Sequence, residues 1–342
     1  MPNGRTIGLG EVSIALGSLV NAMSPILFKP KAPDIHATKW FNSPPLTLKE
    51  LRGKVVMIDF MTYSCVNCVR TFPHLRYLWS KLKDKGLLII GVQSPEFSFE
   101  KDFRNIEDAI KRHGLEYPIA VDNDLEIWNA FGNRYWPAQF FIDKDGNLVH
   151  FRAGEGGEQE IEEWILALLK QAGQEVRLER GPHTEEARML EPITSETYCG
   201  FLRNTGMGNP AVCDGNGKCT YTDSDRTHQP GVIYLDGGWK QAEEYLEHDE
   251  DRPGHILLKC QASEVNLVMT SDRVGDVDIL LDDKPLLLEK VGTDVRQEAG
   301  RSLVRIDRQD MFRLVKTRTV EMHELKIVVK DAGVRAYAYT FG

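Results

Sequence analysis

Apolar positions in the first half of the chain switch between short continuous runs and helical spacing, which predicts an α/β domain over residues 33–172. Residues 55–60 form a compact, β-branched run with the length of a buried strand. Residues 68–82 carry apolar side chains at helical spacing, and Pro73 predicts a kink within that helix. The same pattern predicts further strands at 87–92, 119–121, 139–142 and 148–151, and helices at 99–113, 125–131 and 161–169.

Helical spacing disappears in the second half of the chain. Residues 173–189 are polar and contain a Gly-Pro pair, so they are predicted to be a linker. Beyond them, alternating or continuous apolar runs predict strands at 255–261, 265–270, 277–281, 303–306, 311–316, 324–329 and 334–341. Many short strands at this spacing predict an all-β sandwich, jelly-roll-like, over residues 190–342.

The N-terminal segment, residues 1–32, is predicted to contain a docked amphipathic helix. Apolar residues between positions 12 and 23 recur at helical spacing, but polar residues interrupt them. No small-residue cleavage site follows, and the stretch is too broken to span a membrane. These features favour a cytoplasmic protein.

Size and charge limit the kinds of partner. A chain of 342 residues suits two packed cores, and 42% apolar with 27% charged residues is ordinary for a soluble globular protein. The formal net charge of −9 would repel phosphate backbones, and the basic residues form no stripe. Nucleic acid is therefore excluded as a partner class.

The chemistry of the chain is concentrated in one cysteine pair, Cys65-Val66-Asn67-Cys68. Residues three apart share a helix face, at a separation that a disulfide can close. The start of a helix also stabilises a thiolate through its free amide groups. A zinc site would need two further ligands, and the sequence has neither a second C-x-x-C nor an H-x-x-x-H. The pair is therefore predicted to be redox-active, with no metal.

The residues around the pair resemble a known family. GKVVMIDF at 53–60 and TYSCVNC at 62–68 look like the thioredoxin-like domain of TlpA/DipZ-type oxidoreductases. The resemblance continues through GVQSPEF at 91–97, YWPA at 135–138 and GEGG at 154–157. TSETY at 194–198 and AYAYTFG at 336–342 are similar to the carbohydrate-binding-module-like domain that follows in DipZ-type proteins.

This resemblance implies a thiol-disulfide oxidoreductase and assigns roles by position. Cys65 would be the attacking nucleophile and Cys68 the thiol that resolves the mixed disulfide. Asp59 would be the buried acid that accepts the proton of the resolving thiol, and Pro137 would be a cis-proline facing the pair. The expected partners are protein disulfides or dithiols and an upstream thiol electron donor, with carbohydrate an open option for the second domain. No organic cofactor is needed. DipZ-type proteins often place this domain outside the membrane, so an extracytoplasmic location is the alternative.

Some positions depart from the family pattern or have no fixed role. Met61 stands where a tryptophan is usual, and Val66-Asn67 replaces Gly-Pro between the cysteines, which leaves the direction of electron flow open. Glu96 follows a predicted strand and is a candidate for proton transfer, with an exposed loop carboxylate as the alternative. Trp136 and Tyr63 are candidates for substrate contact.

Two other functions remain as alternatives. Thr62-x-x-Cys65 reproduces part of the peroxiredoxin motif, although Ile58 stands where that motif has proline and Cys68 would have no role. In the second alternative the chain is a non-enzymatic sugar- or protein-binding adaptor, with candidate sugar-stacking rings at Tyr234, Trp239 and Tyr245.

Three of the four cysteines outside the pair are predicted to be structural residues. Cys213 and Cys219 flank a turn-rich loop and suit a hairpin disulfide. Cys260 lies in an apolar run and is predicted to be buried and inert, while the state of Cys199 is left open.

Overall fold

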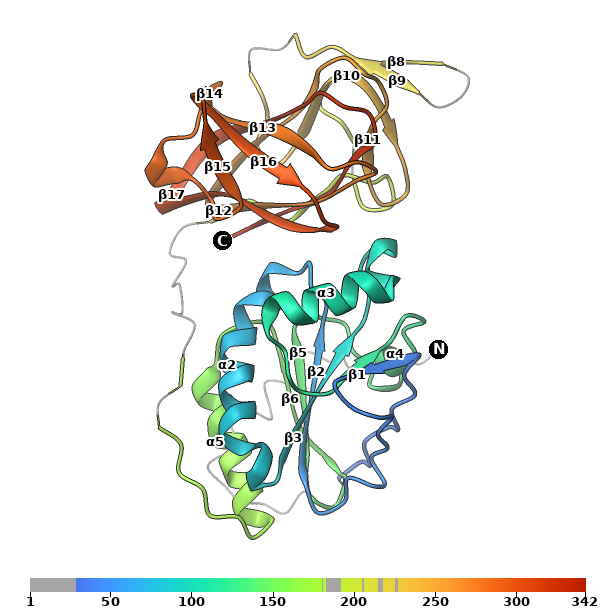
Figure 1. The fold of residues 1–342 in the computed structure, drawn as a ribbon, viewed down its shortest axis with the longest axis vertical. Coiled ribbons are helices and arrows are strands. Elements are labelled where there is room, and N and C mark those ends of the chain that lie inside the picture. Colours follow the sequence, from blue (N-terminus) through green and yellow to red (C-terminus); the bar gives the residue numbers. More distant parts are fainter. Residues whose placement is uncertain (1–28, 180, 183–191, 205, 215–217, 225–226) are drawn as a thin grey trace, which may run out of the picture.

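The computed structural model describes residues 29–179, 181–182, 192–204, 206–214, 218–224 and 227–342. The predicted N-terminal helix, and residues 180 and 183–189 of the predicted linker, lie outside these ranges. Figure 1 shows an α/β domain below an all-β domain.

The first domain is built on a six-stranded mixed sheet with the order β1-β4-β3-β2-β5-β6. Strands β2, β3 and β4 are parallel to one another, and β1, β5 and β6 each pair antiparallel with their neighbours. The bounds are β1 Lys39–Phe41, β2 Val55–Met61, β3 Leu87–Gln93, β4 Ile119–Val121, β5 Ala138–Ile142 and β6 Leu148–Ala153. The central strands β2 and β3 are buried along their whole length, which agrees with their continuous apolar sequence.

Helices cover both faces of this sheet. One face packs against the helices α2 Val66–Leu82, α3 Phe103–His113 and α5 Glu158–Gln171, and the other packs against α4 Glu126–Ala130 and the segment that contains Leu48 and Leu51. The single helix predicted over 99–113 is wrong. The chain forms a 3-10 turn, Ser98–Lys101, and α3 then begins after Asp102, whose carboxylate accepts a hydrogen bond from the amide of Arg104 at 2.8 Å.

In its described residues the second domain forms a twelve-stranded sheet whose named strands all pair antiparallel. The predicted all-β class is confirmed. The strands are β7 Thr197–Tyr198, β8 Ala211–Cys213, β9 Cys219–Tyr221, β10 Ile233–Gln241, β11 Leu246–His248, β12 Gly254–Ser271, β13 Gly275–Leu281, β14 Lys284–Pro285, β15 Val295–Glu298, β16 Arg301–Ile306, β17 Asp310–Val329 and β18 Val334–Phe341.

Two long strands, β12 and β17, organise this sheet. Each was predicted as two separate strands, because polar residues interrupt the apolar pattern in the middle. Strand β12 runs beside β17 throughout, but it exchanges its other neighbour, β10, for β18 after a register shift between Ala262 and Glu264. The strand therefore bends and continues, which lets both halves of the sheet share one core.

The smaller features of the second domain agree in part with the sequence. Cys213 and Cys219 form the predicted hairpin disulfide, and Cys260 is buried as expected. Cys199 is also buried, as a free thiol. Trp239 and Tyr234 lie in the core, so neither ring offers a face to a sugar.

The two domains share part of one apolar core. Val268, Met311, Tyr337 and Ala338 of the second domain belong to the cluster that fills the α2, α3 and α5 side of the first. The ring of Tyr337 lies 5.2 Å from that of Phe97 and 4.9 Å from that of Phe99, in edge-to-face contacts. The second domain is therefore fixed against the loop that follows β3, on the side of the sheet where the cysteine pair lies.

Candidate active site

The cysteine pair lies at the start of α2, directly after the turn that leaves β2. Cys65 is the N-cap residue, and its sulfur accepts a hydrogen bond from the amide of Cys68 at 3.4 Å. Cys65 is half-buried, whereas Cys68 is fully buried, and both are free thiols. Burial raises the pKa of the Cys68 thiol well above its usual value, and the nearby Cys65 and Asp59 add to this shift. The accessible sulfur is therefore that of Cys65.

Asp59 lies within β2, buried in the sheet. Burial raises the pKa of its carboxyl to about 7, against the opposing effect of a hydrogen bond from Gln139. Nε2 of Gln139 donates to Oδ1 at 2.9 Å, and Oδ2 has no hydrogen-bond partner among the described residues. A carboxyl group that exchanges its proton near neutral pH, with one free oxygen, is suited to accept a proton from the Cys68 thiol.

Trp136 and Pro137 directly precede β5, and the backbone of Trp136 lies beside Cys65. The Trp136–Pro137 peptide bond is cis, as expected, and the carbonyl oxygen of Trp136 lies 3.9 Å from the Cys65 sulfur. The indole of Trp136 donates to the carbonyl of Ser94 at 3.0 Å and packs on Trp128 with ring centroids 4.2 Å apart. The Trp136 backbone is therefore held next to the reactive sulfur.

Two of the predicted site residues have other surroundings than expected. Tyr63 is only 3% exposed and packs edge-to-face on Phe99, so little of its side chain is open to a substrate. Glu96 is not a free loop carboxylate. Its Oε1 accepts hydrogen bonds from the hydroxyl of Tyr198 at 3.0 Å and from the guanidinium of Arg203 at 2.8 Å, both in the second domain.

Glu100 is a buried acid of this region that sequence reasoning missed. It is fully buried, and its carboxylate accepts hydrogen bonds from the side chains of Thr62 and Ser64, both at 2.5 Å. It also accepts the amide hydrogens of Glu96 at 2.6 Å and Phe97 at 3.0 Å. In the sequence Glu100 falls inside an apparent helix, where a glutamate reads as a solvent-exposed residue, so no local signal marked it.

Within the described residues, no group of three or more His, Cys, Asp or Glu side chains is arranged to hold a metal ion. No helix in the same ranges is long and apolar enough to cross a membrane.

The sheet order and the cysteine pair at the start of α2 place the first domain in the class of thioredoxin-like folds with a C-x-x-C pair. Comparison with known proteins agrees. Residues 29–151 match the AhpC/TSA family, and residues 194–342 match the family described as thioredoxin like C-terminal domain. The chain therefore joins a redoxin domain of the AhpC/TSA family to a thioredoxin-like C-terminal domain, and it is a homologue of DipZ and ResA proteins.

The similarity to DipZ covers both domains. Protein DipZ of Mycobacterium bovis is 33% identical over 319 residues, which are 91% of this chain and 43% of that protein. The chain thus spans less than half the length of these relatives. Thiol-disulfide oxidoreductase ResA of Bacillus thuringiensis is 30% identical over 120 residues, 35% of this chain and 66% of that protein. A solution structure of a thioredoxin-like protein in the oxidised form is 30% identical and covers 42% of this chain and 97% of its own, with a TM-score of 0.39.

Proposed function

We propose that this protein exchanges disulfides with protein substrates, with Cys65 as the attacking thiol and Cys68 as the resolving thiol. The observation that carries the proposal is the difference between the two sulfurs. Cys65 is accessible and accepts a hydrogen bond from the amide of Cys68, whereas Cys68 is buried one helical turn away. An accessible thiolate attacks first, and a buried neighbour reacts only once the mixed disulfide has formed beside it.

The reductive reaction then proceeds in two exchanges. The Cys65 thiolate attacks one sulfur of the substrate disulfide, and the other substrate sulfur leaves as a thiolate. Asp59 accepts the proton of Cys68, whose thiolate attacks the Cys65 sulfur and releases the second substrate thiol. The Cys65–Cys68 disulfide is returned to the dithiol by two electrons from an upstream thiol donor. The same steps run backwards oxidise a substrate dithiol.

Peroxide reduction is supported less well by the site. In a peroxidatic Thr-x-x-Cys motif the threonine hydroxyl would orient the peroxide at the cysteine. Here the Thr62 hydroxyl donates to Glu100 and accepts from the side-chain amide of Gln93 at 3.0 Å. Carbohydrate binding by the second domain would need a surface other than Trp239 and Tyr234, because both rings are buried.

The proposal is tested by reduction of insulin disulfides with dithiothreitol as the electron donor. The wild-type chain should accelerate the reaction, and Cys65→Ala should return it to the uncatalysed rate. Cys199→Ala is the matched control, because it removes a buried thiol of the second domain and should keep full activity. Equal activity of wild type and Cys65→Ala would refute the proposal.

A further inference from the structure

The carboxylate of Glu100 connects two segments that are far apart in sequence. On one side it binds the hydroxyls of Thr62 and Ser64, in the turn that leads to Cys65. On the other side it binds the amides of Glu96 and Phe97, in the loop after β3. Both oxygens are thus fully used, and each binds one segment only. The carboxylate of Glu100 therefore holds both the turn before Cys65 and the loop after β3.

The hydroxyl donors fix the geometry directly before the reactive sulfur. Ser64 is the residue before Cys65, and the amide of Cys65 bonds back to the carbonyl of Thr62 at 3.3 Å. Both hydroxyl side chains are buried. If the carboxylate were absent, two buried hydroxyls and two amides would lose their acceptor, and the bond from the side-chain amide of Gln93 to the Thr62 hydroxyl would still hold the turn to β3.

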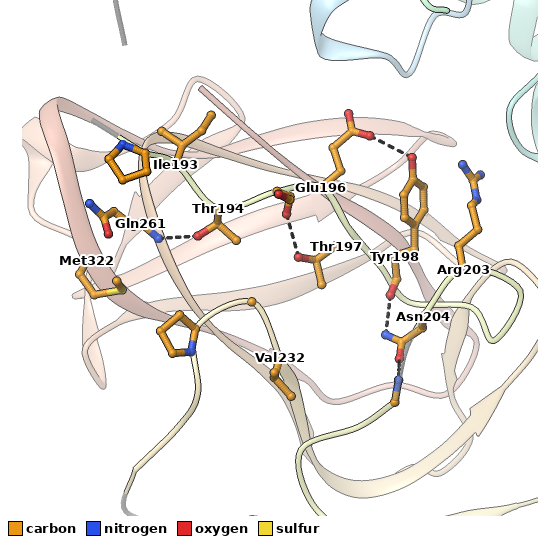
Figure 2. Close-up of a pocket in the computed structure, with 15 residues that line it drawn as sticks. Ile193, Thr194, Glu196, Thr197, Tyr198, Arg203, Asn204, Val232, Gln261 and Met322 are labelled. Carbon is orange, nitrogen blue, oxygen red and sulfur yellow. Dashed lines mark hydrogen bonds between the residues drawn. The ribbon is translucent and has the colours of Figure 1, made fainter. Parts of the chain in front are cut away.

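The loop on the other side of Glu100 is held by the second domain. Glu96 binds Tyr198 and Arg203, and the guanidinium of Arg203 also stacks on the Tyr198 ring at 3.8 Å. Figure 2 shows these two side chains together at the edge of a cavity of about 450 Å³ in the second domain, pointing towards the first domain. Ser98, in the same loop, donates to Glu244 of the second domain at 2.6 Å.

Resting on the function proposed above, we propose that Glu100 is a positioning residue. It holds the turn before Cys65 in the geometry that lets the Cys68 amide bond the sulfur, and it links that geometry to the second domain through the Glu96 loop. The role belongs to its hydrogen bonds, because all four of its partners donate to the carboxylate and hold it in place.

The two substitutions of Glu100 separate hydrogen bonding from charge. In Glu100→Gln the amide oxygen can accept the Glu96 and Phe97 amides, while the amide nitrogen donates to the Thr62 and Ser64 hydroxyl oxygens. In Glu100→Ala all four bonds are lost. The readout is the equilibrium constant of the 65/68 disulfide against glutathione, measured on the full reduced and oxidised chain.

Glu100→Ala should shift this equilibrium about tenfold towards the disulfide, which is roughly 30 mV more negative, because the reduced form loses the fixed Cys68 amide at its sulfur. Glu100→Gln should stay within twofold of wild type. Should Glu100→Ala not fold, Ser64→Ala removes one donor only and should give a smaller shift in the same direction. A role in overall stability alone would lower the unfolding midpoint and leave the equilibrium unchanged.

The link to the second domain is tested with Arg203→Ala, which should shift the equilibrium two- to threefold in the same direction as Glu100→Ala. Arg301→Ala is the matched control. This substitution also removes an ion pair of an arginine, but its partner, Asp278, lies inside the second domain. No shift in folded Glu100→Ala or Ser64→Ala, or equal shifts in Glu100→Ala and Glu100→Gln, would overturn the positioning role. No shift in Arg203→Ala would overturn the link. A wild-type chain with no insulin reduction would instead refute the proposed function.

Discussion

Gln139 and Asp59 face each other across the pairing of β2 with β5, and the amide nitrogen of Gln139 donates to Oδ1 of Asp59 at 2.9 Å. This single bond does not compensate for the burial of the carboxyl group, whose pKa is raised to about 7. The acid thus reduces the stability of the fold at neutral pH, at the position where a proton acceptor for Cys68 is needed.

Asp59→Asn should therefore change stability in a pH-dependent way. Between about pH 4 and pH 7 the unfolded chain releases a proton that folded Asp59 keeps, so wild-type stability falls across this window by roughly 4 kcal/mol. Asparagine has no such loss, but it buries an unpartnered amide hydrogen at a cost of about 1–3 kcal/mol. We expect the variant to be about 2 kcal/mol more stable at pH 8 and about 2 kcal/mol less stable at pH 4, by urea unfolding.

Glu100 also titrates near pH 7, but it is present in both proteins and cancels in the comparison. A stability difference between wild type and Asp59→Asn that does not change with pH would contradict the raised pKa of Asp59.

The same substitution should slow the resolving step. As pH rises through about 7, Asp59 becomes a carboxylate that can accept the Cys68 proton, so the wild-type rate of mixed-disulfide resolution should rise. In Asp59→Asn we expect a rate about 100-fold lower at pH 8, measured by quenched-flow release of the substrate thiol. Asp122→Asn replaces another buried carboxyl group, which binds Ser94 and the start of α4, and should resolve at the wild-type rate.

Cys68→Ser should accumulate covalent mixed disulfides with substrate proteins, because the accessible Cys65 sulfur still attacks but nothing displaces the product. Cys65→Ser should accumulate none, since the remaining Cys68 is fully buried. Non-reducing electrophoresis with mass analysis of the captured species measures both. Equal capture by the two variants would contradict the assigned roles of the two cysteines.

Hydrogen peroxide should be a poor substrate. The Thr62 hydroxyl is bound to Glu100 and Gln93, so it is not available to orient a peroxide at Cys65. We expect the kcat/KM for peroxide, with dithiothreitol as donor, to be at least about tenfold below that for insulin disulfides. The reverse order would favour the peroxiredoxin alternative.

Tyr337→Ala should weaken the contact between the domains. The buried ring packs on Phe97, Phe99 and Tyr245, and truncation of a buried aromatic side chain costs about 3–5 kcal/mol. We expect a single wild-type unfolding transition to separate into two in calorimetry, whereas Tyr337→Phe keeps the ring and should retain one. A single, unshifted transition in Tyr337→Ala would show that the shared core contributes little.

The chemistry at Cys65 and Cys68 was predictable because it depends on local spacing. Two residues three apart at a helix start share one face whatever surrounds them, and the strand before them is marked by its continuous apolar run. The cis bond at Pro137 was also anticipated, but from the resemblance of the surrounding motif and not from physical pattern alone.

Glu100, Glu96 and Tyr63 show what local patterns leave out. Their surroundings depend on which distant segment covers them. Glu100 lies 36 residues from Ser64, and Glu96 lies 107 residues from Arg203. Burial by a segment distant in sequence leaves no periodicity in the local sequence, so a glutamate held by four donors looks the same in sequence as one in solvent.

The amino-acid sequence by itself therefore determined the α/β and all-β classes, the cysteine pair and the 213–219 disulfide, because each follows from the spacing of neighbouring residues. Only the tertiary structure decided that β12 and β17 are single bent strands, that the two domains share a core, and that Glu100 anchors the turn before Cys65. These features depend on contacts between residues far apart in the chain, and their free energy is gained only when the whole fold brings those residues together.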